Sequence, residues 1–113
     1  MLIDNALRLM KTDYIDIVHL HSCDLNTLQR GEVIEALHKT IEQGKVRVAA
    51  YSGENEELKF AVDSNLFGSV QKSINICDQI DLEGSIKQAK EKGIGVIAKR
   101  PIANAPWRFS ERP

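Results

Sequence analysis

Short apolar runs alternate with helix-periodic segments along the whole of this chain. The runs at 13–21, 45–51, 69–74 and 95–98 have the length of strands. The segments between them repeat apolar residues every three or four positions, as helices do. Strands that alternate with helices form βα units around a parallel sheet. We therefore predict an α/β fold of about four parallel strands with alternating helices.

Polar and glycine residues mark where the predicted helices begin and end. Small polar side chains favour the first position of a helix, and glycine favours the left-handed position after the last turn. Four helices are predicted. The first spans 3–11, and the second, a long helix, is capped by Asn26 or Thr27 and ends at Gly44. The third spans 56–64 and ends at Asn65 or Gly68, and the fourth is capped by Asp81 and ends at Gly93.

The first predicted strand carries two histidines near its carboxyl end. Its apolar centre predicts a buried strand, and the spacing of His19 and His21 places both rings on one side of it. Metal binding needs a third ligand, and the remaining histidine, His38, falls inside a predicted helix. A single histidine suffices as a general acid or electrostatic helper. Alternatively, one or both rings fill the interior of the sheet.

Polar residues also follow the other predicted strands. In a (βα)8 TIM barrel the carboxyl ends of the strands build the active-site face, so four successive ends would supply half of its mouth. We accordingly expect a partial barrel, or half-barrel, with a site at these ends. Besides the two histidines, the candidates are Ser52, Gln71 with Asn75, and Lys99 with Arg100.

Composition excludes several classes of function. A chain of 113 residues with 42% hydrophobic content suits one modest domain, and a net charge of -1 gives no footprint for nucleic acid. No apolar run approaches the roughly 18 residues of a membrane span, and the start lacks the pattern of a signal peptide. We expect a cytoplasmic chain without membrane contact. Cys23 and Cys77 suit free thiols; Cys23 is either a nucleophile or incidental.

Four motifs follow one another along the chain: Asp13-Tyr-Ile-Asp-Ile-Val-His-Leu-His21, Glu35-Ala-Leu before Glu42-Gln-Gly-Lys-Val-Arg47, Ser69-Val-Gln-Lys-Ser-Ile-Asn75 and Glu91-Lys-Gly-Ile-Gly-Val-Ile-Ala-Lys-Arg-Pro101. In this order they resemble the middle of the aldo-keto reductases. The resemblance runs from about Leu7 to Asn104, and it implies the fourth to seventh strands of a complete eight-stranded barrel. It thus implies a partial barrel over 1–104, followed by an irregular tail over 105–113.

The resemblance also implies roles for individual residues. His21 matches the histidine that orients the substrate carbonyl, while His19 is not part of the motif. Ser52 and Gln71 match residues that hold the carboxamide of NAD(P)H, but Gly53 replaces the asparagine that accompanies the serine. The stretch Lys99–Ala103, which includes Arg100, matches the loop that approaches the cofactor pyrophosphate. No metal is implied, and Asn75 matches a common family residue without an assigned role.

The family's catalytic tyrosine, lysine and aspartate belong to earlier strands than those matched here. We therefore expect a fragment of an NAD(P)H-dependent carbonyl oxidoreductase, with little or no activity as an isolated chain. The alternatives are a non-enzymatic half-barrel that binds a ligand or partner and, more distantly, a metal-dependent barrel hydrolase. A half-barrel exposes its edge strands and inner face, which predicts a homodimer or higher oligomer.

Overall fold

A computed structural model of the chain describes residues 2–21, 23–103 and 105. Its centre is one four-stranded sheet in the order β1-β2-β3-β4, in which every neighbouring pair is parallel. Consecutive strands are therefore neighbours, as in a segment cut from an α/β barrel. This confirms the predicted fold class. The strands are β1 (Ile15–His21), β2 (Val46–Ser52), β3 (Ser69–Ser73) and β4 (Gly95–Lys99).

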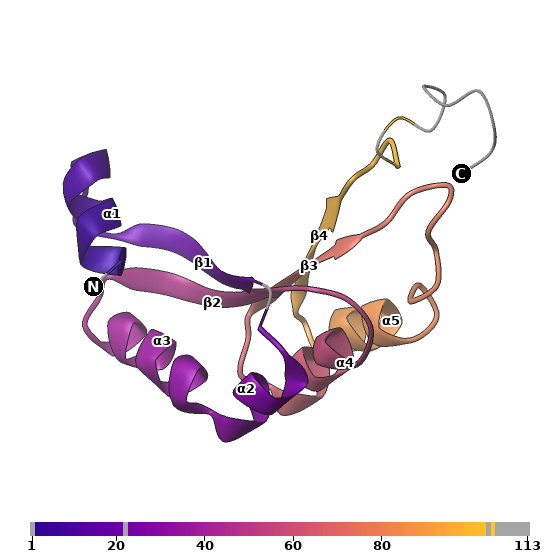
Figure 1. The fold of residues 1–113 in the computed structure, drawn as a ribbon, viewed down its shortest axis with the longest axis horizontal. Coiled ribbons are helices and arrows are strands. Elements are labelled where there is room, and N and C mark those ends of the chain that lie inside the picture. Colours follow the sequence, from indigo (N-terminus) through magenta and orange to yellow (C-terminus); the bar gives the residue numbers. More distant parts are fainter. Residues whose placement is uncertain (1, 22, 104, 106–113) are drawn as a thin grey trace.

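The described residues form five helices, one more than predicted. Figure 1 shows α2 to α5 along one face of the sheet, whereas no helix covers the other face. The helix α1 lies beside the amino-terminal ends of the first two strands, where Asp4 pairs with Lys45 at 2.7 Å. The helices are α1 (Leu2–Met10), α2 (Leu25–Arg30), α3 (Glu32–Glu42), α4 (Asn55–Ser64) and α5 (Ser85–Glu91).

The hydrophobic core lies between the sheet and the covering helices. Leu58, Val62 and Val70 are fully buried, and the ring of Tyr51 packs on that of Phe67 with 5.8 Å between centroids. Burial of one such aliphatic side chain contributes about 1.5–3 kcal/mol. This layer holds the strands in place, and with them the residues at their carboxyl ends.

The long helix predicted before Gly44 is two helices. Gly31 adopts a left-handed conformation with φ of 78° and separates α2 from α3. The predicted caps, Asn26 and Thr27, were wrong: the carboxylate of Asp24 accepts the backbone N–H of Thr27 at 2.7 Å. Apolar spacing continues across the break, which is why periodicity alone joined the two helices.

The prediction that Asp81 caps the last helix was also wrong. The helix α5 begins later, at Ser85, and the carboxylate of Asp81 lies 3.2 Å from the ammonium of Lys72. The predicted ends were better placed. Gly44 and Gly93 have φ of 75° and 74°, and Asn65 has φ of 59°.

The first strand is not buried as predicted. Its side chains are half-buried or exposed, and Ile17 is 39% exposed. Two causes act together, since β1 is an edge strand and the sheet face opposite the helices is open. Ile97 of β4, at the other edge, is 37% exposed.

The predicted boundary between barrel and tail falls largely outside the described residues. Ser22, Asn104 and 106–113 are not among them. Within the described ranges, no helix is both long and apolar enough to cross a membrane.

Candidate active site

Strand register places the predicted site residues in one row. His21 pairs with Ser52, Ser52 pairs with Gln71, and Gln71 pairs with Ile97. Paired residues on parallel strands point to the same side of the sheet. Three of the four positions in this row are therefore polar. The row passes through the last residues of β1 and β2, His21 and Ser52, and through the middle of β3 and β4. The carboxyl ends of the strands form the active-site face of α/β barrels.

The row beneath it is made of small residues beside one histidine. His19 pairs with Ala50, Ala50 with Ser69, and Ser69 with Gly95. Burial lowers the pKa of His19, and its Nε2 is buried without a hydrogen-bond partner among the described residues. A neutral ring above a floor of small side chains favours packing over metal binding.

A pocket of about 370 Å³ lies at the end of this row. His21, Ser52, Lys99 and Arg100 line it, so four of the five residues to which the resemblance assigned a role meet there; Gln71 is not among the lining residues. The ammonium of Lys99 lies 3.4 Å from the hydroxyl oxygen of Ser52, which is 4% exposed. Lys99 therefore contacts Ser52, whereas the family resemblance implied that its stretch approaches the cofactor pyrophosphate.

One carboxylate on the loop after β2 joins Lys99 to a buried lysine. Oε1 of Glu54 lies 3.6 Å from the ammonium of Lys99 and accepts the backbone N–H of Ser73 at 3.0 Å. Its Oε2 lies 3.0 Å from the ammonium of Lys72, which is 3% exposed. Asp78 and Asp81 also pair with Lys72, at 3.5 and 3.2 Å.

Opposing effects act on the buried ammonium. Burial lowers the pKa of Lys72, but hydrogen bonds to Glu54 and Asp81 and the charges of Glu54 and Asp78 outweigh it, so this pKa is raised. Lys72 therefore stays charged at neutral pH. A charged, paired lysine fixes the carboxylates around it.

Asn75, which had no predicted role, ties two loops together. Its side-chain amide donates to the carbonyl of Arg100 at 3.0 Å and accepts the backbone N–H of Cys77 at 2.8 Å. Arg100 has φ of 54°, a left-handed conformation that is uncommon for a residue with a side chain. The hydrogen bond from Asn75 thus fixes the backbone from which Arg100 projects.

Gly53, where the resemblance implied a lost asparagine, lies against a buried ring. A Cβ at this position would meet the hydroxyl of Tyr51 and stand 2.6 Å from its Cε1. The ring is held there because its hydroxyl donates to the carbonyl of Cys23 at 3.3 Å. Glycine at residue 53 is therefore required by the position of Tyr51.

Neither tyrosine has a hydroxyl proton available in the pocket, although Tyr51 is among the residues that line it. Burial, with Glu57, Cys23 and Glu54 nearby, raises the pKa of Tyr51 to about 12, and its hydroxyl is engaged by Cys23. Tyr14 precedes β1, and the guanidinium of Arg47 lies 4.0 Å from its ring centroid.

The described residues contain no group of three or more His, Cys, Asp or Glu arranged to hold a metal. His38, the third histidine, lies in α3 and its Nε2 is 2.8 Å from the carbonyl of Leu66. Cys23 is half-buried and lines the pocket.

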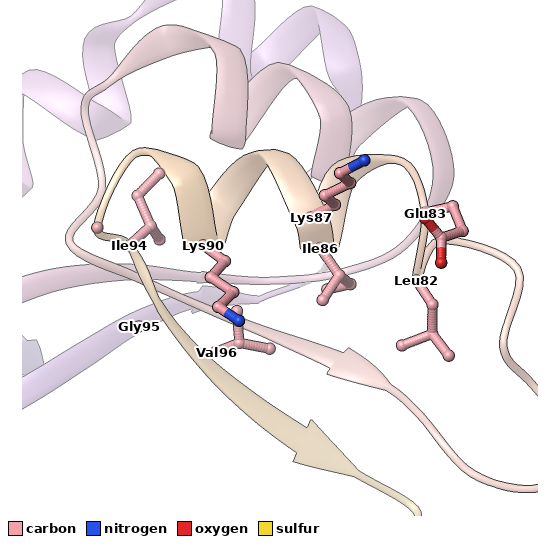
Figure 2. Close-up of a pocket in the computed structure, with 9 residues that line it drawn as sticks. Leu82, Glu83, Ile86, Lys87, Lys90, Ile94, Gly95 and Val96 are labelled. Carbon is pink, nitrogen blue, oxygen red and sulfur yellow. The ribbon is translucent and has the colours of Figure 1, made fainter.

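A second hollow lies away from this site. Figure 2 shows it between α5 and β4, where Leu82, Ile86, Ile94 and Val96 provide an apolar floor. Its volume is about 680 Å³, and Lys87 and Lys90 lie at its rim with Glu83. No strand pairs with the outer edge of β4 in the described sheet, so this hollow is open.

Sequence reasoning missed Glu54 and Lys72. A signal existed for the lysine: Lys72 alternates with Val70 and Ile74, so it had to share the apolar side of its strand. A lysine on such a side is rare unless it is paired. The acidic partners come from loops that follow two different strands, and their convergence could not be read from spacing.

The fold and site together define a segment of a parallel α/β barrel with a polar pocket at the carboxyl ends of its strands. The model of the aldo/keto reductase family matches residues 1–109. The chain belongs to the aldo/keto reductase family.

Similar proteins place the chain within a longer barrel. It is 30% identical to L-galactose dehydrogenase of Arabidopsis thaliana, covering 89% of this chain and 34% of the relative. The holo structure of aldo-keto reductase AKR11C1 from Bacillus halodurans superposes with a TM-score of 0.83 at 26% identity, over 99% of this chain and 38% of that one. An aldo-keto reductase from Klebsiella pneumoniae, solved in complex with NADPH, gives 0.75 at 25% identity, over 92% and 37%. The chain thus spans about a third of the length of these proteins.

Proposed function

We propose that this chain forms the part of an NAD(P)H-dependent carbonyl reductase that holds the nicotinamide end of the cofactor. The observation that carries the proposal is the register row in which His21 and Ser52, the last residues of β1 and β2, align with Gln71 in the middle of β3. The Klebsiella pneumoniae reductase, to which the chain is similar, was solved with NADPH.

The donor and acceptor groups present fit a carboxamide. The carboxamide of nicotinamide has one carbonyl acceptor and one NH₂ donor. A serine hydroxyl both donates and accepts, and so does a glutamine amide. Ser52 and Gln71 are register partners on β2 and β3, so they lie side by side. The bound cofactor would supply a hydride to a small carbonyl substrate.

The other residues of the row act on the carbonyl and on the charge of the ligand. His21 lines the pocket beside Ser52, where its ring would donate a hydrogen bond to a carbonyl oxygen and orient it. Arg100 adds positive charge at the rim, which suits the phosphates of the cofactor. His19 lies one row deeper and packs against the small residues there.

These 113 residues alone reduce carbonyls slowly or not at all. Reduction leaves a negative oxygen that needs a proton, and a general acid must lie within hydrogen-bond reach of it. Tyr51 donates to Cys23 and is buried, while Tyr14 precedes β1. Residues outside this stretch of the barrel would supply the acid in a complete reductase.

The open surfaces of the sheet support a homodimer or higher oligomer. A cytoplasmic location is a separate part of this proposal. Val96 and Ile97, on the outer strand β4, are 36% and 37% exposed, and the hollow beside α5 is apolar. Exposed apolar surface next to an unpaired strand edge favours association. Sizing at micromolar concentration tests this; a monomer with a cooperative melt would contradict it.

A titration of NADPH followed by nicotinamide fluorescence tests the main proposal. Saturable binding is expected, and Gln71→Ala should weaken it about tenfold, the loss of roughly one net hydrogen bond. Gln29→Ala, on exposed α2, is the matched control and should bind like the parent chain. No saturation at millimolar NADPH would contradict the proposal.

A further inference from the structure

The ammonium of Lys99 lies between two oxygens of the site. It is 3.4 Å from the Oγ of Ser52 and 3.6 Å from the Oε1 of Glu54. Its side chain is 18% exposed, so these neighbours, more than water, surround it. The family resemblance had implied that the stretch containing this lysine approaches the cofactor pyrophosphate.

The contact with Ser52 sets the direction of the serine's hydrogen bond. An ammonium has three donors and no acceptor, so Ser52 must be the acceptor from Lys99. The hydroxyl proton of Ser52 is then left to donate elsewhere. Because this serine is 4% exposed, the pocket is the open side toward which that proton can point.

Glu54 is fixed firmly enough to hold the lysine. The buried ammonium of Lys72 binds its Oε2 at 3.0 Å, and the backbone N–H of Ser73 donates to its Oε1 at 3.0 Å. Two partners on the rigid strand β3 thus immobilise the carboxylate on the loop after β2. The carboxylate also offsets the positive charge of Lys99, which makes the lysine a poorer site for an anion.

We propose that Lys99 is a positioning residue, held by Glu54, that fixes Ser52 as a hydrogen-bond donor to a neutral carbonyl oxygen of the ligand. The ligand group it selects is an amide or similar carbonyl, and it is not a phosphate. The inference rests on the proposed function in that the nicotinamide carboxamide supplies such a carbonyl. It assigns the phosphate charge of the cofactor to Arg100.

A double-mutant cycle with NADPH tests this assignment. Ser52→Ala should weaken binding about tenfold and Lys99→Met about fivefold, each the loss of one hydrogen-bond interaction. The double variant should bind no more weakly than Ser52→Ala alone, because Lys99 acts through the serine. Losses that multiply would overturn the proposal.

The matched control removes the same charge from the neighbouring residue. Arg100→Met should weaken binding at low salt, and most of that loss should vanish in 0.5 M salt (about 4–5 Å screening length), as expected of a phosphate contact. The loss caused by Lys99→Met should persist in the same salt. A loss at Lys99 that also vanishes would show a direct contact with phosphate and overturn the proposal.

A measurement without ligand separates this inference from the proposed function. If Lys99 is held by Glu54, then Glu54→Gln and Lys99→Met should lower the urea midpoint by less together than the sum of their separate shifts. Additive shifts would overturn the positioning role even if NADPH binds. If the shifts are coupled but NADPH does not bind, Lys99 is held by Glu54 as inferred, and the proposed function is refuted.

Discussion

Gly53 gives the sharpest test of the packing beneath the site. A Cβ on residue 53 would overlap the ring of Tyr51, at 2.6 Å from Cε1, and no φ in the left-handed region adds strain there. The obstacle is the ring alone. Tyr51 is 1% exposed and its hydroxyl is held by Cys23, so it cannot move without loss. Gly53→Ala should therefore destabilise the chain by about 1–3 kcal/mol, the usual range for overpacking a core.

Urea unfolding followed by circular dichroism measures this cost. The companion variant Tyr51→Leu removes the obstructing ring and lowers the free energy of unfolding by itself, so it serves as a second reference background. In that background Gly53→Ala should cost less than about 0.5 kcal/mol, because nothing remains to overlap the new methyl group. Gly53→Asn, which introduces the asparagine that the family resemblance implies here, should likewise be destabilising in the parent chain.

Two results would refute the reasoning. One is that Gly53→Ala leaves the urea midpoint of the parent chain unchanged. The other is an equal cost in the parent and Tyr51→Leu backgrounds, which would place the strain in the backbone of residue 53. Either result would mean that the ring of Tyr51 does not fill the space beside Gly53.

Three further predictions concern the neighbouring groups. Lys72→Met leaves three carboxylates without their buried cation and should lower the free energy of unfolding by about 3 kcal/mol at pH 7, as urea unfolding would show; an unchanged urea midpoint would contradict it. Burial raises the pKa of Tyr51 to about 12 in the folded chain. The contribution of its neutral hydroxyl to the free energy of unfolding is therefore constant below about pH 10 and is lost as the pH rises from 10 to 12. Tyr51→Phe should remove this part of the loss of stability at alkaline pH, and an unchanged loss would argue against burial of the hydroxyl. Asn75→Ala releases the carbonyl of Arg100 and should weaken NADPH binding about threefold. The double variant with Arg100→Met should bind NADPH no more weakly than Arg100→Met alone, because Asn75 acts through Arg100. If the two losses of affinity multiply, Asn75 does not act through Arg100.

The sequence was sufficient for the sheet because each strand and each helix end carries a local signal. Apolar runs marked all four strands, and Gly44 and Gly93 marked two helix ends in the left-handed conformation that the structure shows. The break between α2 and α3 was missed because the apolar spacing runs through Gly31. Local patterns are most informative where one residue determines the conformation.

Only the part of the candidate site that lies on the strands could be predicted from the sequence. His21, Ser52 and Gln71 lie in one row because the register of the parallel strands aligns the last residues of β1 and β2 with the middle of β3. Glu54 and Lys72 meet through two loops and a buried side chain, and the contact of Lys99 with Ser52 depends on that meeting. Long-range contacts of this kind have no signature in spacing.

The most direct test of the central claim is to locate the cofactor by NMR. NADPH added to ¹⁵N-labelled chain should shift the backbone amide signals of Gly53 and Lys99, at the carboxyl ends of β2 and β4, and of Gln71 in the middle of β3. The signals of Val46 and Gly95, at the opposite ends of β2 and β4, should stay in place. Shifts confined to the opposite strand ends or to the hollow beside α5, or no shifts at millimolar NADPH, would contradict the assignment of this row as the nicotinamide site.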